Sequence, residues 1–86
     1  MKSAYELAME RLGGTQELSA EQKAQLADID SRYDAKKAQE EMTAEDALQG
    51  AQGDPDSQER IRKGHATELA RIAEKREAEK NKIRNA

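Results

Sequence analysis

The sequence predicts an all-α fold, a long antiparallel helical hairpin of coiled-coil character preceded by a short N-terminal helix. Two charge-rich stretches of nearly equal length, 18–49 and 55–86, flank a segment at 50–54 that contains two glycines. No glycine or proline interrupts residues 19–49. Charged residues make up 38% of the chain and aromatic residues only 2%, so the core has to be thin. Together these observations favour one domain, 1–86, built from paired helices.

The first predicted element is a short helix at 3–12. Ser3 and Glu6 have the spacing of a capping box, in which each side chain accepts a hydrogen bond from a free backbone amide of the other residue. Apolar residues then recur at helical spacing: Tyr5, Met9 and Leu12. The glycine pair that follows ends this helix and begins a linker, 13–18, because glycine readily adopts the left-handed conformation found at helix ends.

The second predicted element is a long helix at 19–49. Ser19 and Gln22 have the spacing of another capping box at its start. The apolar stripe begins with three residues at helical spacing: Leu26, Ile29 and Tyr33. It is interrupted in the middle of the helix, where Lys37 stands at a position that favours an aliphatic side chain, and it resumes only near 44–48. The predicted contact between the helices is therefore sparse.

The third predicted element is a long helix at 55–84, joined to the second by a turn at 50–54. Gly50 is expected to close the preceding helix, and Asp54 is expected to cap the next one, which has proline at its first position. We call the line along which the two long helices are expected to face each other the seam. The seam positions of this last helix are Ile61, His65, Leu69, Ile72, Arg76, Lys80 and Ile83. Gly64 is its weak point, because glycine in a helix interior costs about 1 kcal/mol relative to alanine.

Charge is distributed unevenly between the two halves of the chain. Residues 1–53 hold six basic and eleven acidic side chains, and residues 54–86 hold nine basic and seven acidic ones. Antiparallel packing would bring the cations Lys75, Arg76, Lys80, Lys82 and Arg84 beside the carboxylates Glu17, Glu21, Asp28 and Asp30. Exposed ion pairs contribute only about 0–1 kcal/mol each. These charges are therefore expected to set register and orientation rather than stability.

The sequence shows no catalytic, cofactor-binding or metal-binding site. His65 is the single histidine and there is no cysteine, so the usual zinc ligand spacings are missing. Asp28, Asp30 and Asp34 begin like a calcium loop. The required glycine at the sixth position is missing, however, and Gln39 stands where the twelfth position needs glutamate. We therefore predict a protein that is not an enzyme, needs no cofactor and has no evident small-molecule substrate, with His65 as a half-buried packing residue.

No segment approaches the roughly 18 apolar residues of a membrane span, and no hydrophobic region follows Met1 as it does in a signal peptide. The absence of cysteine agrees with a reducing compartment. The expectation is a cytoplasmic location without membrane association.

Three segments resemble a group of small bacterial proteins: residues 2–12 (KSAYELAMERL), 18–23 (LSAEQK) and 29–33 (IDSRY). The resemblance covers mainly the first third of the chain. Proteins of this group are uncharacterised, helical and coiled-coil-like. The resemblance therefore implies a helical protein of bacterial cytoplasmic origin, and it implies no activity and no catalytic residue.

The leading functional hypothesis is a non-enzymatic interaction or assembly protein that self-associates, with a dimer favoured, or that binds another helical protein. The residues predicted to carry the contact are Tyr5, Met9, Leu12, Leu26, Ile29, Tyr33, Leu69, Ile72 and Ile83. Whether the short first helix packs on its own hairpin or swaps onto a neighbouring chain stays open. The alternative is a nucleic-acid or ribosome-associated binding protein that uses the basic end of the last helix. It is less favoured, because glutamates interleave with those cations and no aromatic residue is available there for base stacking.

Overall fold

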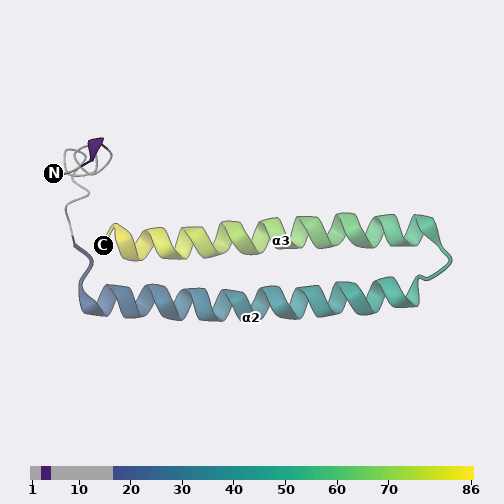
Figure 1. Ribbon diagram of the computed structural model, residues 1–86, viewed down its shortest axis with the longest axis horizontal. Coiled ribbons are helices and arrows are strands. Elements are labelled where there is room, and N and C mark those ends of the chain that lie inside the picture. Colours follow the sequence, from purple (N-terminus) through teal and green to yellow (C-terminus); the bar gives the residue numbers. More distant parts are fainter. Residues whose placement is uncertain (1–2, 5–16) are drawn as a thin grey trace.

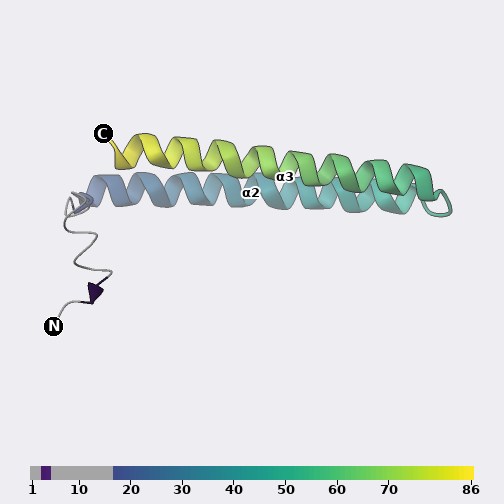
Figure 2. The same cartoon turned by 90° about the horizontal axis from the view of Figure 1, so that it is seen from above.

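Two long helices make up nearly all of the chain that the computed structural model describes, residues 3–4 and 17–86. Helix α2 runs over Ala20–Gly50 and helix α3 over Pro55–Arg84. They lie antiparallel, with the turn at one end and the C-terminus beside the start of α2 at the other (Figure 1). The view from above shows the same two helices staying together from the turn to the open end (Figure 2). The predicted all-α helical hairpin is confirmed.

Two sequence predictions fall outside the described residues. The short helix expected at 3–12 is described only at its first two positions, and the linker expected at 13–18 only at its last two. The interface residues predicted in this region are Tyr5, Met9 and Leu12, and they stay predictions.

The start of α2 is held by the predicted capping box. The Ser19 hydroxyl oxygen accepts a hydrogen bond from the Gln22 amide at 3.0 Å, and the Gln22 side-chain oxygen accepts one from the Ser19 amide at 2.9 Å. The side-chain amide of Gln22 also donates to the carbonyl oxygen of Ile83 at 3.1 Å. The cap therefore ties the beginning of α2 to the end of α3 as well as starting the helix.

The turn uses its glycines differently from the sequence expectation. Gly50 is the last residue of α2, and the helix is capped by Ala51, whose amide donates to the Ala47 carbonyl at 3.1 Å. The residue in the left-handed region is Gly53, with φ of 85°, where the chain reverses just before the next helix. Asp54 caps α3 as predicted, because its carboxylate accepts hydrogen bonds from the amide of Ser57 at 3.3 Å and from its hydroxyl at 2.7 Å.

The core of the hairpin is thin. Among the described residues, the buried ones are Ile29, Tyr33 and Ala44, all from α2. Helix α3, which is described throughout, has no buried residue and contributes half-buried apolar side chains instead. Every residue of α2 from 34 to 39 is exposed, so the interruption predicted around Lys37 is present in the structure. A single pair of helices can bury only the stripe where they touch, which explains why so little is enclosed.

Helix α3 continues through Gly64 without a break. A Cβ atom placed on Gly64 would meet no atom within 4 Å. We expect Gly64→Ala to raise the free energy of unfolding by about 1 kcal/mol, because alanine has the higher helix propensity, and urea denaturation measures this. The matched control is Gly53→Ala, which should lower the unfolding free energy because φ of 85° strains a residue with a side chain. A destabilised Gly64→Ala variant would contradict the prediction.

Candidate association surface

A cluster of charged side chains bridges the two helices near their open end. Asp30 accepts hydrogen bonds from the Nη2 and Nε atoms of Arg76 at 2.7 and 2.9 Å and from Nζ of Lys80 at 3.0 Å. Arg76 also donates from Nη1 to Asp34 at 3.0 Å. The donors Lys80 and Arg76 lower the pKa of the Asp30 carboxyl below its usual 3.8, and Asp30 in turn raises the pKa of Arg76. These partners lie 46 and 50 residues apart in the sequence, so they fix the register of α3 on α2.

The Asp30 cluster predicts a specific loss of stability in acid. Its folded pKa lies below the ordinary value of 3.8, so the ionised carboxylate stabilises the hairpin above that value. This contribution is lost as the pH falls through the folded pKa. We expect the melting temperature of the native protein to fall more steeply below pH 3.8 than that of Asp30→Asn, in thermal melts followed by circular dichroism.

The control for the acid experiment is Asp46→Asn, which changes an exposed carboxylate on the same helix. Asp46 makes no ion pair with any residue that the structure describes. This variant should keep the acid slope of the native protein. Equal slopes for Asp30→Asn and the native protein would contradict the role given to Asp30.

Tyr33 closes the seam beside the charged cluster. Its side chain is buried. The neighbouring carboxylate of Glu79 on α3 and burial raise the pKa of Tyr33 above its usual 10. Lys36 lies over the ring, with its Nζ atom 4.6 Å from the ring centroid, and Arg32 lies 3.8 Å from Glu79. The aromatic ring is thus held from both helices.

His65 meets Glu40 across the seam on the turn side of Tyr33. The Nδ1 atom of His65 lies 3.4 Å from a carboxylate oxygen of Glu40, and the two side chains are 26% and 23% exposed. His65 is therefore half-buried, as the sequence predicted. Within the described part of the chain, no group of three or more histidine, cysteine or carboxylate side chains is placed to hold a metal ion.

Two open grooves flank Ile72 in the middle of the hairpin. The first, the Leu69 groove, has a volume of about 240 Å³ and is lined by Lys37, Leu69, Ile72, Ala73 and Arg76. The second, the Lys36 groove, has a volume of about 400 Å³ and is lined by Ala35, Lys36, Gln39, Glu40, Glu68 and Ile72. Both are lined on the α2 side by members of the exposed segment 34–39. This segment contains no large apolar residue, and Leu69 and Ile72 of α3 are only half-buried beside it.

All six described residues that the sequence predicted for the association contact are buried or half-buried in the hairpin. Ile29 and Tyr33 are buried, and the half-buried members are Leu26, Leu69, Ile72 and Ile83. Their contacts in the structure are within one chain, between its two helices. Sequence reasoning did not include Ala44 among the core residues, although it lies where the apolar stripe resumes, and it did not identify Ala73 as part of a groove. Ala73 follows Leu69 by four residues, which places both on one face of the helix, and this spacing could have identified it.

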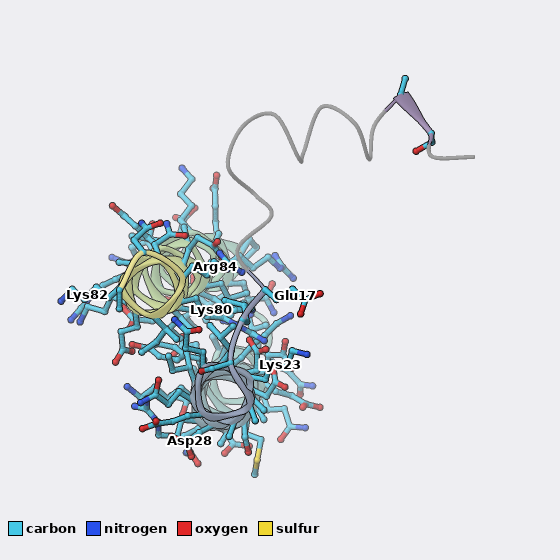
Figure 3. The ribbon with its side chains drawn as sticks, turned by 90° about the vertical axis from the view of Figure 1, so that its left-hand side faces the viewer. Glu17, Lys23, Asp28, Lys80, Lys82 and Arg84 are labelled. Atoms are coloured by element: carbon cyan, nitrogen blue, oxygen red, sulfur yellow. The ribbon has the colours of Figure 1, made fainter. Side chains whose placement is uncertain are left out.

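The cations at the end of α3 differ in whether they pair with the other helix or with their own. Lys80 lies between the helices, whereas Lys82 projects away from them (Figure 3). Arg76 and Lys80 bind Asp30 as predicted, but Arg84 pairs with Glu77 of its own helix at 2.6 Å, which lowers the pKa of Glu77. Asp28 likewise pairs within its helix, with Arg32 at 3.1 Å. Two of the charges expected to pair across the seam, Asp28 and Arg84, therefore have their partners on their own helix.

No family model, curated protein or solved structure matches this chain. None of the helices among the described residues combines the length and the apolar character needed to cross a bilayer. The geometry of the hairpin is thus the basis for the functional argument.

Proposed function

We propose that this chain is a non-enzymatic helical association module that self-associates, as a dimer, through the open middle of its hairpin. The observation that carries the proposal is the position of Leu69 and Ile72. Both are large apolar residues at the centre of α3, both are only half-buried, and both line the Leu69 groove. A second helical layer on this groove would remove them from water.

The energetics support an association of this kind. Completing the burial of a leucine or isoleucine side chain contributes a share of the roughly 1.5–3 kcal/mol that full burial provides. Small helical proteins with few enclosed side chains commonly obtain the missing stability by oligomerisation. A hairpin whose buried residues come from α2 alone fits that pattern.

The polar side chains of the seam support a structural role. Asp30 is engaged by Arg76 and Lys80, and Tyr33 by Glu79. These pairs hold the two helices together. A cytoplasmic location belongs to the same proposal and is supported by the resemblance of residues 2–12 to small bacterial proteins.

Nucleic-acid binding through the basic end of α3 has weaker support. Arg76 and Lys80 neutralise Asp30, and Arg84 neutralises Glu77. A phosphate backbone would have to displace these carboxylates.

The test is sedimentation equilibrium of the purified chain at neutral pH over a micromolar concentration series. We expect a mass of twice the 9.6 kDa of one chain at the higher concentrations. A mass of one chain throughout the series would overturn self-association.

A further inference from the structure

The two faces of the hairpin that flank Ile72 differ in chemistry. The Leu69 groove is formed by Leu69, Ile72 and Ala73 together with the stems of two cationic side chains. The Lys36 groove is lined by Ala35 and Ile72 together with four polar or charged residues, among them Glu40 and Glu68. The Leu69 groove holds two large apolar side chains, Leu69 and Ile72, against one in the Lys36 groove, so a second apolar surface has more to cover there.

A strip of mainly acidic residues runs along α2 on the side of the hairpin that carries the Leu69 groove, here called the Leu69 face. Lys37 lines the groove, and Glu41 and Glu45 follow it at spacings of four residues, so all three share one side of the helix. Asp30 and Asp34 precede them and bind α3 from the same side. Glu41 and Glu45 are exposed and make no ion pair with any described residue.

A basic strip runs along α3 on the same face. Its members at spacings of three and four residues are Arg62, Ala66, Leu69, Ala73, Arg76 and Lys80. Arg62 is exposed and has no ion-pair partner within the described residues. Counted from the turn, Arg62 lies at about the level of Glu41 and Glu45, across the hairpin from them.

A second copy can cover this face by a twofold rotation in either of two directions. If the two turns lie at opposite ends, α3 packs on α3 and the basic strips oppose each other, as do the two acidic strips. If the turns lie at the same end, α2 of each copy packs antiparallel on α3 of the other. Arg76 and Lys80 are already paired with Asp30 of their own chain, so the unpaired charges that this arrangement brings together are Arg62 and the carboxylates Glu41 and Glu45 of its partner.

We propose that the partner is a second copy of this chain, seated on the Leu69 groove with its turn at the same end, forming a four-helix bundle. This inference rests on the proposed self-association and adds its face and direction. Lys23 and Arg84 lie on one side of the hairpin at its open end (Figure 3). In the proposed bundle, Lys23 of one copy therefore comes near Arg84 of the other, and their like charges repel. Arg84 is already paired with Glu77 there.

The direction is tested by a spin label on Gln52→Cys in the turn, since the native chain has no cysteine. With both turns at one end, the two labels should lie within about 30 Å, because neighbouring helices in bundles pack about 10 Å apart. With turns at opposite ends, the labels should be separated by about 45 Å or more, the length of 31 helical residues. A dimer with the longer distance overturns this inference, whereas a monomeric mass overturns the proposed function itself.

The face is tested by charge reversal. Arg62→Glu should raise the dissociation constant about tenfold, equivalent to 1.4 kcal/mol, because it sets a carboxylate against Glu41 and Glu45. Adding Glu41→Arg and Glu45→Arg should restore the native affinity. The matched control is Lys75→Glu, an equal charge change on α3 in the row of Glu68 and Ile72, on the side of the Lys36 groove. If Lys75→Glu weakens the dimer and Arg62→Glu does not, the assigned face is wrong.

Discussion

Replacing Ile29 by aspartate is expected to unfold the hairpin. Ile29 is 5% exposed and is one of the few buried side chains in the described chain. The change removes its packing and places a charge in the seam, beside the existing carboxylate of Asp30. Loss of a buried isoleucine alone costs about 2–5 kcal/mol, and a buried unpaired charge adds to it. A hairpin with so few buried side chains does not have enough free energy of unfolding to absorb this loss. Helicity in far-ultraviolet circular dichroism should therefore fall to that of an unfolded chain.

The control for this experiment is Met42→Asp on the same helix. Met42 is 60% exposed, so its replacement should leave helicity and association nearly unchanged. This comparison separates the effect of burial from the effect of an added negative charge on α2. A helical, associating Ile29→Asp protein would show that the seam in the structure is not what holds the chain together.

Replacing Ile72 by aspartate is expected to abolish the dimer. Ile72 is the residue shared by the Leu69 and Lys36 grooves, so a carboxylate there reaches the surface that a second copy would cover. We expect the dissociation constant to rise at least about 100-fold, which corresponds to about 2.8 kcal/mol. Helicity should fall together with the mass, because the same side chain packs within the hairpin and between copies.

Sedimentation and circular dichroism on the same samples measure both effects of Ile72→Asp. Thr67→Asp is the control, since Thr67 is exposed on α3 and lies on neither groove. Unchanged mass and unchanged helicity for Ile72→Asp would exclude the open middle of the hairpin as the association surface.

The sequence alone was sufficient for the features that depend on neighbours a few residues apart. The Ser19 capping box, the Asp54 cap and the uninterrupted helix between them follow from side chains that bond to backbone groups within one turn. The interruption at Lys37 could also be read from helical spacing, because a lysine on an apolar stripe has the same consequence wherever the partner helix lies. The turn was less predictable, since Gly50 and Gly53 were both able to provide the left-handed residue.

Only the tertiary structure decided which charges pair across the seam and where it stays open. Asp30 forms ion pairs with Arg76 and Lys80 of the other helix, whereas Arg84 pairs with Glu77 of its own helix. These outcomes depend on how far apart the two helices lie and how each is rotated about its axis, and helical periodicity fixes neither quantity. The unequal grooves beside Ile72 arise in the same way. Local bonding determined the helices, and the packing of one helix on the other determined the surface available for association.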